Sequence, residues 1–140
     1  MSAVLRTTRA RLVVVSLTMA AAACGNGTST ATAPSTPATP SAETWSSTLA
    51  PRGTSSRSFT VTAAGTIGVT LLSAETTIGV GVGLPRVSGG GCRLGVAVST
   101  GGGSAPQISV PADVGQYCVQ VYDLGTLTDP VSFSLKIDHP

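Results

Sequence analysis

Short segments in which apolar and polar residues alternate run from about residue 44 to the end of the chain. A two-residue period places apolar side chains on one face of an extended strand, so this alternation predicts β-strands. Phe59 and Val61 share one face in this way, and no segment has a convincing helical period. The expected strands cover residues 44–49, 56–63, 66–73, 77–84, 92–99, 107–110, 116–123 and 131–137.

Many short strands joined by Gly- and Pro-rich turns predict an all-β fold, an antiparallel β-sandwich or jelly roll of about eight strands over residues 43–140. The composition agrees, because Gly, Ala, Ser, Thr and Val dominate and suit strands and turns better than helices. Within 77–84 the alternation predicts one buried face, made of Ile78, Val80, Val82 and Leu84. Within 92–99 it predicts another, made of Leu94, Val96 and Val98.

Residues 1–23 have the parts of a bacterial export signal: a basic start, a short apolar run and small residues at the end. The apolar run, 12–23, is shorter than the roughly 20 residues that a membrane-spanning helix needs. Its end, Ala21-Ala22-Ala23-Cys24, resembles the lipobox of bacterial lipoproteins, although that family commonly has Leu where Ala21 stands. The resemblance implies cleavage before Cys24, diacylglycerol on its thiol, and a lipid bilayer as a partner. An ordinary secretory peptide, cut in the same alanine run, is the alternative.

Residues 24–42 are predicted to be a linker between the lipidated cysteine and the domain. This segment has no charged residue and carries regularly spaced prolines at Pro34, Pro37 and Pro40, so it is expected to be extended and solvated. Its Ser, Thr and Pro content also permits O-glycosylation. We expect an extracytoplasmic protein anchored to a bacterial membrane. Gly25 carries no acidic retention signal, which favours the outer membrane in a cell that has two.

The chain has three cysteines, an odd number for an exported protein. Lipidation of Cys24 leaves Cys92 and Cys118, which we expect to form a disulfide in an oxidising compartment. The alternative, a metal site, needs more ligands than two cysteines and the distant His139 provide.

Three stretches resemble the bacterial pre-peptidase C-terminal domain family. They are SFTVTAAGT at 58–66, GQYCVQVY at 115–122 and VSFSL at 131–135. The resemblance covers most of residues 43–140. It implies a β-sandwich or jelly roll attached to secreted proteins, commonly as an accessory to extracellular peptidases.

No pattern of catalytic residues stands out, so we expect a protein that is not an enzyme and needs no cofactor. The one histidine, His139, is next to last, where residues are poorly ordered unless they are tied down. Asp123 and Asp129 flank a turn that could hold calcium through oxygen ligands. We favour a plain turn, because Asp is a common turn residue.

Glycines alternate with valines at Gly79, Gly81 and Gly83. The spacing does not fit a nucleotide-binding loop, which requires a following helix. We expect a sheet face with almost no side chains, extended by Gly95 and Ala97, against which another surface could dock. The alternative is that the protein's own Gly-rich loops cover this face.

After residue 12 the chain has five basic and six acidic residues, a net charge of −1 with no basic stripe. Such a surface offers no electrostatic footprint for nucleic acid. The sequence therefore favours a non-catalytic lipoprotein that binds an envelope protein or glycan. The alternative is a purely structural envelope protein that packs through the glycine-rich face.

Overall fold

The computed structural model describes residues 39–140, and these residues form eight strands. The strands are β1 (Ser41–Leu49), β2 (Thr54–Val61), β3 (Gly65–Ala74), β4 (Ile78–Pro85), β5 (Cys92–Thr100), β6 (Ile108–Ala112), β7 (Gly115–Tyr122) and β8 (Val131–His139). All strand pairings between them are antiparallel, so the all-β prediction is confirmed. Across 39–140 no helix is long and apolar enough to cross a membrane.

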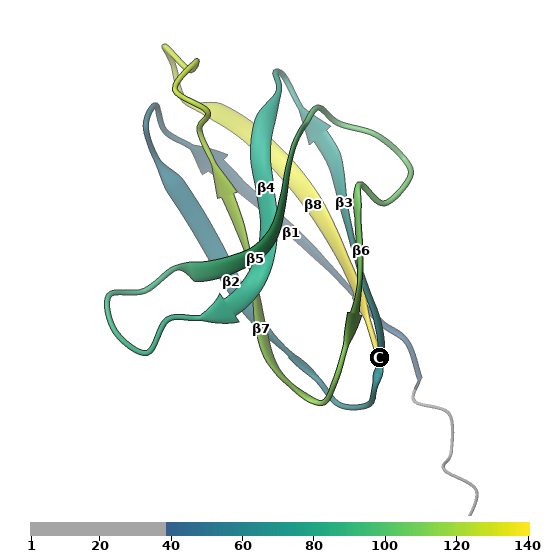
Figure 1. Ribbon diagram of the computed structural model, residues 1–140. Coiled ribbons are helices and arrows are strands. Elements are labelled where there is room, and N and C mark those ends of the chain that lie inside the picture. The colour runs from purple at the N-terminus through teal and green to yellow at the C-terminus, as the bar shows by residue number, and fades with distance from the viewer. Residues whose placement is uncertain (1–38) are drawn as a thin grey trace, which may run out of the picture. The chain divides into compact units, whose positions relative to one another are not determined.

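The strands form two four-stranded sheets, ordered β1-β8-β3-β6 and β2-β7-β4-β5 (Figure 1). The pairs β1·β8, β2·β7, β3·β6 and β4·β5 are those of one long hairpin, folded so that alternate pairs fall in opposite sheets. This order is the jelly-roll arrangement of an antiparallel sandwich.

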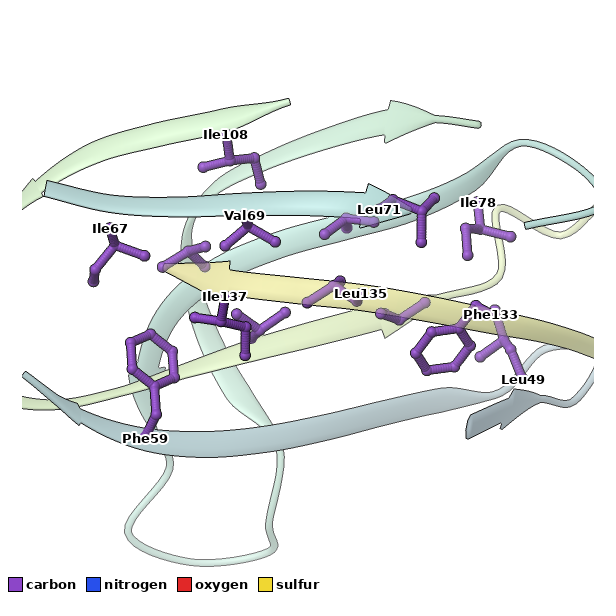
Figure 2. Packing of buried hydrophobic residues seen from close by; sticks show 14 of the residues in the cluster. Leu49, Phe59, Ile67, Val69, Leu71, Ile78, Ile108, Phe133, Leu135 and Ile137 are labelled. Carbon is purple, nitrogen blue, oxygen red and sulfur yellow. The ribbon is translucent and has the colours of Figure 1, made fainter. Parts of the chain in front are cut away.

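The apolar side chains that alternate along the strands meet between the two sheets. Phe59 and Ile67 lie toward one end of this cluster, and Phe133 and Leu49 toward the other (Figure 2). The Trp45 ring packs edge-on against Phe133, with ring centroids 5.1 Å apart. The cluster draws on all strands except β5, whose Val98 packs against it half-buried. Residues 39–140 therefore carry their own core.

Each expected strand is present, with boundaries that differ from the prediction by a few residues. β1 begins at Ser41 rather than Thr44, and β8 continues to His139 rather than ending at Ile137. The extensions coincide, because Ser41 pairs with His139 at the end of the β1·β8 ladder.

Three predicted core residues, Leu84, Leu94 and Val96, lie outside the core, and Val96 is 42% exposed although it pairs with the buried Val82. Leu84 is 53% exposed, because β4 pairs with β7 only as far as Gly83 and Leu84 extends beyond the sandwich. Leu94 faces outward because the β4·β5 register shifts there: Val82 pairs with Val96, but Gly83 pairs with Leu94. The extra residue, Gly95, forms a β-bulge that inverts the alternation of side chains in β5.

Candidate binding site

The outer face of β4 is not bare, which corrects the expectation for Gly79 and Gly81. Both glycines are buried. A Cβ on Gly79 would overlap the ring of Tyr122, which comes from β7, and a Cβ on Gly81 would lie 2.7 Å from Cδ1 of Leu94. The cover is therefore provided by side chains of the neighbouring strands, not by Gly-rich loops as the alternative supposed.

Gly83 allows the start of β5 to lie directly against β4. A Cβ at this position would overlap the Arg93 carbonyl oxygen and come within 2.8 Å of the Leu94 Cα. Glycine in a strand marks such a close approach of two backbones. β5 bends strongly on its way along β4 (Figure 1). Gly95 and Ala97 are exposed, as expected, and docking at these two positions stays a prediction.

Residues 84–93, from the end of β4 to the start of β5, form a projecting connection that we call the arm (Figure 1). The predicted disulfide between Cys92 and Cys118 is confirmed and ties the arm to β7, with 5.9 Å between the two Cα atoms. The Cys92 N–H also donates to Oε1 of Gln120, at 2.9 Å. Within the arm, the Arg86 N–H donates to the Gly91 carbonyl at 3.1 Å, and Arg86 Nε donates to the Cys92 carbonyl at 3.2 Å.

The arm and the outer face of the β2-β7-β4-β5 sheet together line an open hollow, which we call the arm hollow. Its lining comes from β2, from β7 and from the arm: Thr54, Ser56, Gln120, Arg86, Ser88, Gly89, Gly90 and Gly91. The three glycines have φ values of +83°, +67° and +77°, a backbone conformation that glycine adopts without steric cost. Hydroxyl, amide and guanidinium groups dominate this surface, and no carboxylate lines it.

The arm combines cations with exposed apolar side chains. Arg86 and Arg93 are exposed and form no ion pair among residues 39–140. Val87 is fully exposed and Leu84 half-exposed. No acidic residue occurs between Leu84 and Leu94. The arm therefore carries two positive charges, while the domain as a whole has a net charge of −1.

The Asp123 carboxylate joins two loops instead of facing outward to a ligand. Its Oδ2 accepts the Arg52 N–H at 2.7 Å, and its Oδ1 accepts the N–H groups of Gly125, Thr126 and Leu127 at 2.9–3.2 Å. The Arg52 hydrogen bond is the main cause that lowers the pKa of Asp123 below its ordinary value of 3.8. Asp129 accepts from the Thr128 hydroxyl at 3.1 Å. These contacts fit the plain-turn interpretation, because donors already occupy both oxygens of Asp123.

His139 is held in place, which the sequence-based interpretation of a mobile terminal residue missed. Its side chain is buried at the inner face of β8, with its ring centroid 5.0 Å from that of Phe59. Nε2 lies 3.4 Å from Oε1 of Glu43, and the other oxygen of that carboxylate pairs with Arg57 at 3.0 Å. This cluster joins the edge strands β1 and β2, so it links the two sheets.

Within the described part of the chain, no three His, Cys, Asp or Glu side chains come together in a way that could hold a metal ion. Cys24, the export signal and nearly all of the linker lie outside the described residues. The expectations for them stay predictions.

No family model matches this sequence, and no curated protein matches it. The resemblance to the pre-peptidase C-terminal family therefore also stays a prediction, although the observed sandwich is the fold that it implies.

Proposed function

We propose that this protein is a membrane-anchored, non-catalytic lipoprotein whose sandwich domain binds an envelope protein or glycan at the arm and the arm hollow. The observation that carries the binding role is the arm itself. One disulfide and three hydrogen bonds hold it, while Arg86 and Val87 remain exposed. These bonds fix the base of the arm at Arg86 and Cys92, and groups that are fixed before binding lose less conformational entropy when a partner arrives.

The anchor in this proposal is diacylglycerol on Cys24, outside the described residues. From Cys24 to β1 the linker spans on the order of 50 Å when fully extended, at about 3.1 Å per residue. Such a reach lets the domain meet partners in the envelope away from the lipid surface. In a cell with two membranes, we place the anchor in the outer one.

A purely structural role through the glycine face has less support. Tyr122 and Leu94 cover Gly79 and Gly81, so a neighbour could reach the β4 backbone only if these side chains moved. The arm requires no such movement.

The binding role is tested with the full chain purified from its native membranes and immobilised. Cell-wall glycans and envelope extracts are passed over it, and saturable retention is measured. We expect retention to weaken in the arm variants Val87→Ser and Arg86→Ala and to persist in Thr48→Ala, on the outer face of the other sheet. Retention by all three variants alike would place the partner elsewhere, and no retention by the unaltered chain would contradict a binding role.

The anchor is tested by the intact mass of the same material. A chain that begins at Cys24 and is heavier by attached acyl groups is the expected result. A chain with an unmodified amino terminus would overturn the anchor and leave the binding experiment unaffected.

A further inference from the structure

We propose that the arm hollow binds a glycan that carries carboxylate groups, with Arg86 as the carboxylate-binding residue. This inference rests on the proposed binding function and names the class of partner. Its basis is the pairing of a cation on the arm with hydroxyl and amide groups on the sheet below it.

Arg86 has the geometry of an anion-binding residue. Its Nε donates to the Cys92 carbonyl at 3.2 Å, which fixes the plane of the guanidinium group. The disulfide holds that carbonyl in turn, because it belongs to the bridged Cys92. The two Nη groups form no ion pair with any residue of 39–140. A planar guanidinium with two free donors suits a carboxylate, which it binds through parallel hydrogen bonds.

Gln120 places a second donor at the same hollow. Its Oε1 accepts the Cys92 N–H at 2.9 Å, which requires the amide NH₂ group to point elsewhere and leaves that group as a donor. Ser56 pairs with Gln120 in the β2·β7 ladder, so its hydroxyl lies on the same face. A hydroxyl-rich ligand such as a saccharide matches this mixture of amide and hydroxyl groups.

Tyr122 extends the site along β7. It lies two residues beyond Gln120 on the same outer face, a step of about 6.7 Å along a strand. Its ring covers Gly79 and is partly exposed. An aromatic ring offers an apolar face to the C–H groups of a sugar. A saccharide chain lying along β7 would therefore meet Tyr122, then Gln120, then Arg86.

An anionic bilayer is the competing occupant, because Leu84 and Val87 are exposed beside the two arginines. Thr54, Ser56, Ser88 and Gln120 line the hollow, however, whereas Leu84 and Val87, the side chains that would enter a bilayer, do not. The polar lining favours the glycan.

The test titrates the full chain, purified from membranes in neutral detergent, with three probes by isothermal calorimetry. The probes are a galacturonic acid hexamer, a neutral galactose hexamer and inorganic sulfate. We expect the acidic hexamer to bind about ten- to hundredfold more tightly than the neutral one, as the loss of a charge-assisted hydrogen bond implies. Sulfate binding as tight as the acidic hexamer would overturn a glycan site and leave only a small-anion site.

Two matched pairs of variants locate the site. Arg86→Gln is expected to lower the affinity for the acidic hexamer about ten- to hundredfold. Arg52→Gln is the control, because Arg52 is also an exposed arginine that forms no ion pair among residues 39–140, and it is expected to leave the affinity unchanged. Ser56→Asp keeps every arm contact but adds a repelling carboxylate, so it is also expected to weaken binding. Thr60→Asp, farther along the same face of β2, serves as its control.

If the two variants of either pair changed the affinity for the acidic hexamer equally, the assignment of the glycan site to the arm hollow would be overturned. Binding to anionic vesicles that depends on Val87, without hexamer binding, would replace the glycan by a lipid surface. Retention of an envelope protein in the experiment above, again without hexamer binding, would refute this inference alone and leave the proposed binding function standing.

Discussion

Substitution of Gly83 by Ala is expected to destabilise the domain far more than the same change at Gly95. The added Cβ at Gly83 would lie 2.7 Å from the Arg93 carbonyl carbon and 2.8 Å from the Leu94 Cα. Both are backbone atoms, so β5 and the arm must move. At Gly95 the nearest atom is the Val82 carbonyl oxygen at 3.8 Å, an ordinary contact.

The size of the effect follows from what must move. Overpacking of a tight interior site costs about 1–3 kcal/mol. Displacement of the arm also weakens the hydrogen bonds from Cys92 to Gln120 and from Arg86 to Cys92, each worth about 1 kcal/mol. Gly83→Ala is therefore expected to lower the free energy of unfolding by about 3–5 kcal/mol. Gly95→Ala is expected to raise it by about 0.5–1 kcal/mol, because alanine loses less backbone entropy in a strand.

The assay is urea unfolding of the oxidised segment 39–140, which contains the whole core described above. The fluorescence of Trp45 reports the transition, because this ring packs against Phe133. A loss of several kcal/mol is easily measured in a domain whose stability is about 5–15 kcal/mol. If Gly83→Ala stayed within about 1 kcal/mol of the parent, or if Gly95→Ala cost as much, the close contact between β4 and β5 would not be what requires glycine.

Three further predictions concern the disulfide and the two loops that Asp123 joins. Reduction of Cys92–Cys118, which closes 26 residues, should lower the free energy of unfolding by about 3–4 kcal/mol in the chain-entropy estimate, measured by urea unfolding with and without reductant. Because the pKa of Asp123 is lowered in the folded state, its contribution is present above pH 3.8 and is lost as the pH falls through the folded-state value. The difference in Tm between the parent and Asp123→Asn should therefore shrink below pH 3.8, and a constant difference would count against these hydrogen bonds. Arg52→Gly should stabilise the domain by about 0.5 kcal/mol, since Arg52 has a φ of +57° after Pro51 in a turn that favours glycine; a lower Tm would contradict this.

The eight strands could be predicted because their core faces follow a local rule. Phe133, Leu135 and Ile137 alternate with polar residues, and burial of one face is enough to fix the strand. The same alternation continues to His139, so the burial of His139 could have been predicted from the sequence. It was not predicted, because terminal residues were assumed to be mobile.

The candidate site could not be predicted in the same way, because it depends on contacts between distant segments. Leu94 covers Gly81 only because the bulge at Gly95 inverts the alternation of side chains in part of β5. The local sequence pattern does not predict that bulge. The bond from Arg52 to Asp123 joins residues 71 positions apart. The disulfide was the exception, because the expected lipidation of Cys24 left Cys92 and Cys118 as the single pair.

The pairing of β1 with β8 has a consequence for the order in which this domain can fold. β1 finds its partner only when β8 is also present, so the β1-β8-β3-β6 sheet cannot close on a chain that still lacks its last strand. Such distant pairings are slow to form. The β4·β5 hairpin, by contrast, is local, and the cysteine that ties it down lies on β7, before β8. We therefore expect the arm to form early, and the edge joined by His139 and Glu43 to close last.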